Sequence, residues 1–203
     1  MKKFKGLQSI KETLANHIAA QHKCTDQSKS VCAPGTRVKI QVDILEWLSP
    51  QPGTNEQIFW ITGIAGSGKS TLSATIVDNL REKGTPVTAQ FFISRNIPET
   101  INPANIISTI ALQLAEFSPA AAGTIHDALK LGVPPTRKKQ VKELLLAPIW
   151  ELSKSHTAVI ILIDALDELE NASKSVLEIL ESIAPKNCDL PQNVRFLITS
   201  RPE

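Results

Sequence analysis

The chain has 203 residues, enough for one globular domain with short extensions. Its composition, 42% hydrophobic and 21% charged, is ordinary for a folded protein and argues against a disordered chain. A net charge of +2, without a basic run interleaved with aromatic residues, argues against a nucleic-acid partner. The three widely spaced cysteines make no disulfide framework, and no apolar run approaches the roughly 20 residues that span a bilayer. We therefore expect a cytoplasmic protein without a membrane partner.

The start of the chain is predicted to hold an amphipathic helix and a connection. Apolar residues recur at helical spacing within the first 23 residues: Leu7, Ile10, Leu14 and Ile18. Residues 24–35 are polar and rich in turn formers, and a second helix is expected over 36–48. We therefore separate an N-terminal helix and linker, residues 1–31, from the main domain, residues 32–203.

From residue 58 onward, apolar strands alternate with helices. The expected strands cover residues 58–62, 87–93, 159–163 and 194–199. The expected helices cover residues 69–83, 103–116, 119–131, 138–154 and 173–184. Because strands that alternate with helices pair in parallel, the pattern predicts an α/β sheet with a helical insert between its second and third strands.

A glycine-rich loop connects the first strand to its helix. Its sequence, Gly63-Ile64-Ala65-Gly66-Ser67-Gly68-Lys69-Ser70, fits the Walker A pattern G-x-x-x-x-G-K-[ST] at every fixed position. Glycines let such a loop curl until successive N–H groups face phosphate oxygens, and the helix dipole favours the same anion. In this pattern Lys69 contacts the β- and γ-phosphates, Ser70 is a magnesium ligand, and Thr71 adds a contact to the α-phosphate. A strand before the loop and a helix after it favour a nucleotide site over a chance turn.

The apolar run at 159–163 ends in carboxylates. Asp164 stands at the carboxyl end of this strand, where it can hold Mg²⁺ directly or through water, as a Walker B aspartate does. Asp167 or Glu168 can orient or deprotonate the attacking water, and we favour Glu168. The alternative for these two residues is the acidic first turn of a helix.

The last strand also ends in polar residues, Thr199, Ser200 and Arg201. If this strand lies between the first and the third, Arg201 senses the γ-phosphate, and Thr199 or Ser200 can bond that phosphate or the water. The alternative is a surface arginine at a strand end. We therefore predict a three-layer P-loop NTPase core whose four parallel strands lie in the spatial order first, fourth, third, second, with the first strand at an edge.

In combination these motifs resemble the NACHT domain, and most closely the fungal, nephrocystin-like branch of the STAND signalling NTPases. The segments that carry the resemblance are residues 63–70, 91–95 (Phe-Phe-Ile-Ser-Arg), 164–168 (Asp-Ala-Leu-Asp-Glu), 197–202 (Leu-Ile-Thr-Ser-Arg-Pro) and an upstream Pro-Gly-Thr-Arg at 34–37. The resemblance covers residues 32–203, most of the chain. Relative to that family, the chain is expected to stop after the sensor strand, without the fifth strand, the helical lid and the winged-helix domain.

The resemblance implies a nucleotide cofactor, ATP or less commonly GTP, with Mg²⁺. It also implies slow hydrolysis, coupled to a switch between a closed and an open, oligomeric state. Protein partners or self-association would then depend on flanking domains. Gly35, Thr36 and Arg37 would lie near the base and ribose, and the alternative for Thr36 is the N-cap of the following helix.

Three other readings remain beside a slow ATPase. A GTP-preferring enzyme would carry Asp-x-x-Gly and Asn-Lys-x-Asp, whereas position 167 is Asp and the second motif is absent. A small-molecule phosphotransferase needs an arginine-bearing lid, and the insert offers only Arg95 and Arg137. A non-hydrolysing, nucleotide-dependent interaction module, or a remnant of one, fits the same motifs.

Overall fold

The computed structural model describes residues 6–49, 56–170, 174, 178, 181, 183 and 190–202. Within these residues the chain forms a four-stranded, wholly parallel sheet in the order β1-β4-β3-β2. The strands are β1 (Ile58–Thr62), β2 (Ala89–Phe92), β3 (Val159–Asp164) and β4 (Val194–Ser200). The predicted α/β fold and strand order are confirmed, although β2 is shorter than the expected 87–93. Of the helix expected at 173–184, the structure describes only residues 174, 178, 181 and 183, and these four are helical.

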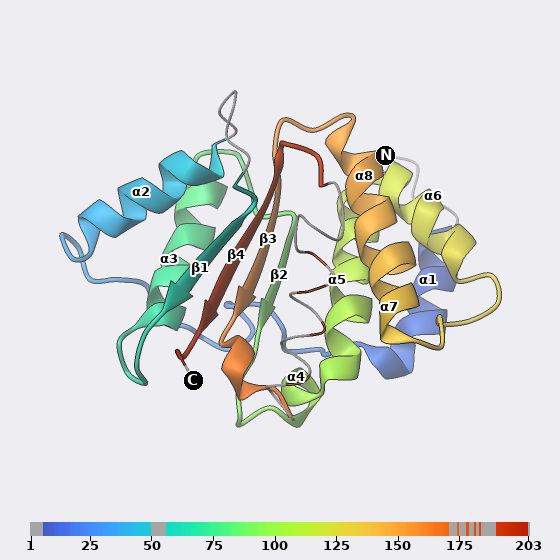
Figure 1. The fold of residues 1–203 in the computed structure, drawn as a ribbon, viewed down its shortest axis with the longest axis horizontal. Coiled ribbons are helices and arrows are strands. Elements are labelled where there is room, and N and C mark those ends of the chain that lie inside the picture. The colour runs from blue at the N-terminus through green and yellow to red at the C-terminus, as the bar shows by residue number, and fades with distance from the viewer. Residues whose placement is uncertain are drawn as a thin grey trace.

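Helices cover both faces of the sheet, which gives three layers (Figure 1). One face carries α2 (Val38–Leu48) and α3 (Lys69–Glu82). The other carries the insert between β2 and β3, together with α1 (Gly6–Leu14), which packs on the insert and continues into the short 3₁₀ turn η1 (Ala15–His17). In the described part of the chain, no helix is both long and apolar enough to cross a membrane.

The insert contains the three expected helices and one that the sequence did not predict. They are the short α4 (Pro98–Ile101), α5 (Pro103–Phe117), α6 (Pro119–Ala128) and a long final helix. The final helix runs through α7 (Arg137–Gln140), a π-helical segment η2 (Val141–Leu146) and α8 (Ala147–Ser153). Pro148 has no N–H to bond the carbonyl of Leu144, so the wide π turn falls where the α-helical ladder is interrupted.

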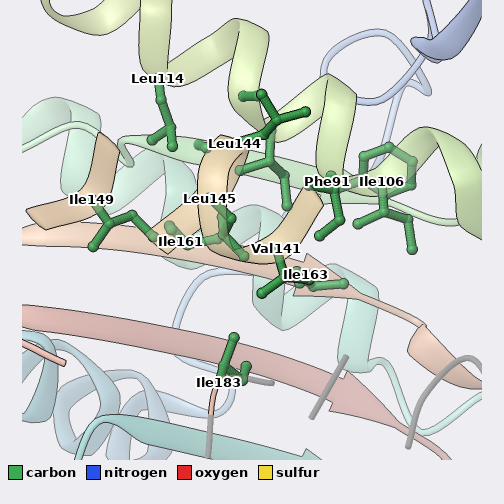
Figure 2. Packing of buried hydrophobic residues seen from close by; sticks show 14 of the residues in the cluster. Phe91, Ile106, Leu114, Val141, Leu144, Leu145, Ile149, Ile161, Ile163 and Ile183 are labelled. Carbon is green, nitrogen blue, oxygen red and sulfur yellow. The ribbon is translucent and has the colours of Figure 1, made fainter. Parts of the chain in front are cut away.

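The side chains of β3 alternate between two cores, as a strand buried on both faces requires. Ile161 and Ile163 pack with the insert, and Figure 2 shows the π segment lying over them. Ile160 and Leu162 face the other way and pack with residues of α3, including Ile76. The sheet is thereby held between α3 and the insert, with the carboxyl ends of its strands left at one edge.

The two edges of the sheet differ. Residues 19–32, which we call the strap, run along the outer edge of β2. The Phe92 N–H donates to the His22 carbonyl (2.8 Å), and the Gln27 side-chain amide donates to the Phe92 carbonyl (2.6 Å). The Cys24 N–H donates to the Gln90 side chain at 3.1 Å. At the opposite edge, the only strand of the described residues that pairs with β1 is β4, as expected.

Candidate functional site

The candidate site lies where the carboxyl ends of the strands meet the start of α3. The Gly63 N–H donates to the Ser200 carbonyl (3.3 Å), and the Ile93 N–H donates to the Asp164 carbonyl (3.1 Å). A pocket of about 440 Å³ opens at this edge. One wall consists of residues of the glycine loop, 63–70, and the first turn of α3. The opposite wall consists of Ala165, Asp167, Glu168 and Arg201. The structure therefore brings most of the predicted site residues around one cavity.

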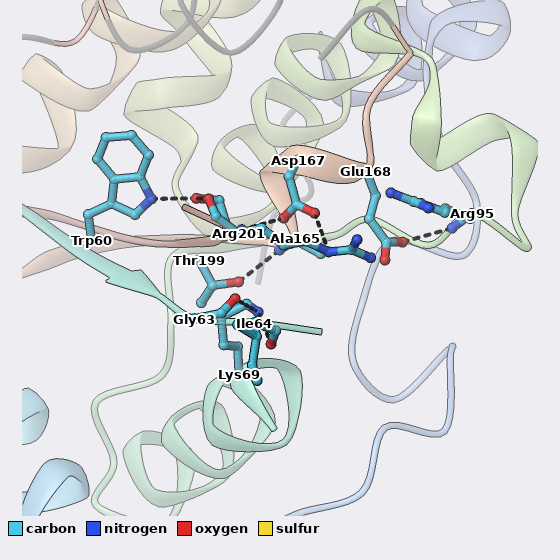
Figure 3. Close-up of polar contacts among 11 residues, drawn as sticks. Trp60, Gly63, Ile64, Lys69, Arg95, Ala165, Asp167, Glu168, Thr199 and Arg201 are labelled. Atoms are coloured by element: carbon cyan, nitrogen blue, oxygen red, sulfur yellow. Dashed lines mark hydrogen bonds and ion pairs between the residues drawn. The ribbon is translucent and has the colours of Figure 1, made fainter. Parts of the chain in front are cut away.

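The glycine loop is tightly curled. Gly66 and Gly68 have left-handed backbones, with φ of +75° and +79°, and the Ser67 N–H closes a turn onto the Ile64 carbonyl (3.2 Å). The Lys69 ammonium folds back over the loop, where it donates to the carbonyls of Gly63 (2.6 Å) and Ile64 (3.1 Å) (Figure 3). This loop conformation needs glycine at both positions, because L side chains rarely adopt such φ values.

Arg37 contacts the glycine loop in a way that the sequence did not predict. Its guanidinium donates to the carbonyls of Ser67 (2.8 Å) and Gly68 (2.7 Å), and Arg37 is not among the residues that line the pocket. Arg37, with a left-handed φ of +54°, is itself the N-cap residue of α2. Thr36 is not the cap, because its hydroxyl donates to the Ala33 carbonyl instead. Arg37 therefore stabilises the glycine loop by donating hydrogen bonds to two backbone carbonyls of that loop.

Asp164 is fully buried at the end of β3, behind the pocket wall. Its Oδ1 atom accepts two hydrogen bonds, from the hydroxyls of Ser73 (2.8 Å) and Thr199 (2.7 Å). Its Oδ2 atom is buried and has no hydrogen-bond partner among the described residues. A buried carboxylate oxygen that has no hydrogen-bond donor is a suitable cation ligand, because leaving it uncompensated is costly.

Thr199 and Ser200 do not have the expected roles. Thr199 is fully buried; its hydroxyl donates its only hydrogen to Asp164 and accepts from the Ala165 N–H (2.8 Å). The Ser200 hydroxyl accepts from the Trp60 indole (2.9 Å) and donates to the Arg201 carbonyl (2.8 Å). Both hydroxyls therefore hold the strand tip together, and neither lines the pocket.

The two acidic residues beyond Asp164 lie in a 3₁₀ turn, η3 (Leu166–Glu168), at the mouth of the pocket. Both oxygens of Asp167 are engaged by Arg201: Oδ1 accepts from the backbone N–H (2.9 Å), and Oδ2 lies 3.2 Å from Nε. One oxygen of Glu168 accepts from the Arg95 N–H at 3.0 Å (Figure 3). Asp167 is thus held in an ion pair, whereas Glu168 keeps an oxygen for another partner.

Ser73 is the site residue that sequence reasoning missed. It follows Lys69 by one turn of α3 and is fully buried. The available signal was a hydroxyl on the apolar face of a helix, beside Leu72 and Ile76, where a polar side chain needs a buried partner.

Ala165 has a strained backbone, with φ +60° and ψ +47°. This left-handed conformation costs an L-residue about 1–2 kcal/mol, and the bond from its N–H to Thr199 maintains it. We expect Ala165→Gly to raise the free energy of unfolding by about 0.5–1 kcal/mol, after allowing for the larger entropy of the unfolded glycine chain. Ala165→Val should lower it, because a β-branched residue tolerates this region least. Urea unfolding followed by circular dichroism measures both, and a less stable glycine variant would contradict the strain.

The parallel sheet in this order, covered by helices on both faces, defines a P-loop-like α/β protein. The family described as nephrocystin 3, N-terminal, matches residues 38–201, and the chain belongs to this family. The match begins at the first residue of α2 and ends at Arg201, so it includes every pocket residue but leaves out Arg37, α1 and the strap. The comparison with curated proteins found no match. The expected nephrocystin-like family is thereby confirmed.

Proposed function

We propose that this chain is the nucleotide-binding domain of a NACHT-type signalling NTPase of the STAND class, which binds ATP with Mg²⁺ and hydrolyses it slowly. The observation that carries the proposal is the juxtaposition of the glycine loop with a buried carboxylate. The loop opens directly into α3, and α3 holds Asp164 of β3 through Ser73. A phosphate-binding loop and an acidic strand tip at one sheet edge are what triphosphate chemistry requires.

The phosphates would bind in the curl of the glycine loop, against the backbone N–H groups and the start of α3. Lys69 now bonds two neutral carbonyls of its own loop. An anionic phosphate is a stronger partner for an ammonium than a neutral carbonyl, so we expect Lys69 to move onto the β- and γ-phosphates. Thr71 lines the same pocket and would contact the α-phosphate.

The residues present also fit Mg²⁺. Ser70 lines the pocket, and the unpartnered oxygen of Asp164 lies at the tip of β3, so both offer the hard oxygen ligands that this ion prefers. Bound Mg²⁺ would supply positive charge to the β- and γ-phosphates. Because Asp164 is buried behind the pocket wall, we expect its contact with the ion to run through water.

Glu168 is the better candidate for orienting the attacking water. Asp167 has both oxygens on Arg201, whereas Glu168 has one oxygen on the Arg95 N–H. Arg201 would sense the γ-phosphate by leaving Asp167 for the stronger anion. This exchange would change how firmly the segments at the strand tips are held, and partner proteins or further copies could recognise that change through flanking domains.

We propose a cytoplasmic location for the protein, because its three widely spaced cysteines fit a reducing compartment.

A titration with fluorescently labelled nucleotides tests the proposal. Labelled ATP should bind in the presence of Mg²⁺. Excess EDTA should weaken ATP binding, because it removes the metal that neutralises phosphate charge. ATP should bind more tightly than GTP, since the chain has no guanine-recognising Asn-Lys-x-Asp. No binding of either nucleotide at millimolar concentration would refute the proposal. Tighter GTP binding would establish the GTP-preferring alternative, and binding without phosphate release the non-hydrolysing module.

A further inference from the structure

Two buried hydroxyl groups bond to the carboxylate of Asp164 and connect three elements of the fold. Ser73 comes from α3, Thr199 from β4 and Asp164 from β3, and all three side chains are fully buried. Both hydroxyls donate to the same carboxylate oxygen, Oδ1, at 2.8 and 2.7 Å. The other oxygen, Oδ2, is equally buried and has no partner among the described residues.

This asymmetry is not what packing alone would favour. A buried carboxylate is stabilised most when hydrogen bonds are shared between its two oxygens, because each lone pair left without a donor costs free energy. Two hydrogen bonds to one oxygen instead define the rotation of the carboxylate about its side chain. The direction of the Thr199 hydroxyl is set as well, because its oxygen accepts from the Ala165 N–H and its hydrogen must point to Asp164.

The position of Ser73 on α3 connects the carboxylate to the proposed metal site. Ser73 follows Ser70 by three residues, so the two hydroxyls occupy neighbouring positions on one side of the helix. The helix that presents Ser70 to the pocket therefore also holds Asp164 by its Oδ1 atom. Oδ2 is buried as well, but it has no hydrogen-bond donor among the described residues.

We propose that Ser73 and Thr199 are positioning residues, which hold Oδ1 of Asp164 so that Oδ2 alone serves the Mg²⁺ site. This inference rests on the proposed function. The two hydroxyls orient the carboxylate before the metal arrives, so no rotation has to be frozen when Mg²⁺ and nucleotide bind. Partners of a metal-binding carboxylate outside the ligand shell act on metal affinity in this way, typically by about 10- to 100-fold.

The test measures how much Mg²⁺ strengthens nucleotide binding, as the ratio of the Kd for labelled ATP in EDTA to the Kd in saturating Mg²⁺. Ser73→Ala and Thr199→Val should each lower this ratio by about tenfold. The Kd in EDTA should stay within about twofold of the wild type, because the glycine loop and Lys69 are unchanged. Ser73→Thr and Thr199→Ser, which keep the hydroxyl, should restore most of the ratio. Asp164→Asn gives the value for a site without the carboxylate.

The outcomes separate the inference from the function on which it rests. If Ser73→Ala and Thr199→Val keep the wild-type ratio, the two hydroxyls do not position the carboxylate. An equal weakening of both Kd values would show a structural role only and would also overturn the inference. A wild-type chain that binds no nucleotide, or binds it equally with and without Mg²⁺, refutes the proposed function and the inference with it. Thermal unfolding of each variant checks its folding, and if Thr199→Val does not fold, the Ser73 pair of variants decides.

Discussion

Replacing Lys69 with alanine is expected to weaken ATP binding by at least about 100-fold, which equals about 2.8 kcal/mol of binding free energy. Lys69 is the one cation that the glycine loop itself contributes to the pocket. Its contact with the phosphates is a charge-assisted interaction at a helix N-terminus, where both the ammonium and the helix dipole favour the anion. The measurement is a fluorescence titration with labelled ATP in Mg²⁺.

The same substitution should leave folding almost unchanged. Within the described part of the chain, the ammonium makes hydrogen bonds only to the carbonyls of Gly63 and Ile64, and the curl of the loop depends on the left-handed backbones of its glycines. Lys83 lies exposed at the opposite end of α3, so Lys83→Ala is a matched control that should bind ATP as the wild type does. Full affinity in the Lys69 variant would show that the loop does not hold the phosphates.

Glu168→Gln is expected to lower the rate of ATP hydrolysis by about 100-fold or more while leaving the Kd for ATP within about twofold. A carboxylate can accept a hydrogen bond or a proton from the attacking water, and the neutral amide is a much weaker base. The glutamine side chain has the same shape and can still accept the bond from the Arg95 N–H through its carbonyl oxygen. Phosphate release under single-turnover conditions measures the rate.

Two further variants define the result. Glu82→Gln, at the exposed far end of α3, should hydrolyse ATP at the wild-type rate. Asp167→Asn should loosen Arg201, because it removes the charge that the guanidinium faces, while part of the hydrolysis remains. Hydrolysis that survives in Glu168→Gln and is lost in Asp167→Asn would transfer the handling of water to Asp167.

The sheet could be predicted because its signals are local. The continuous apolar run of β3 has to be covered on both faces, and strands that alternate with helices pair in parallel. Gly68 and Lys69 stand at the junction of strand and helix, so the pattern itself placed the glycine loop at the carboxyl edge of the sheet. Asp164, at the end of the parallel strand β3, had to reach the same edge.

The contacts that define the site more finely are long-range, and no spacing in the sequence encodes them. Arg37 meets the glycine loop across 30 residues, and Thr199 meets Asp164 across 35. Which hydroxyl binds which carboxylate oxygen depends on side-chain rotation and on the register of neighbouring elements. The distinction between Asp167 and Glu168 has the same origin, since it depends on Arg201 pairing with one of two nearby acids.

The strap has a practical consequence for anyone preparing the protein. A recombinant fragment cut at the family boundaries, residues 38–201, would lose the His22 carbonyl and the Gln27 amide that bond to β2. Such a fragment would expose backbone groups of β2, and unpaired strand edges promote aggregation. It would also lose the guanidinium of Arg37 from the glycine loop. A preparation that begins at residue 6 or earlier keeps both, so poor solubility of the shorter fragment would reflect where it was cut.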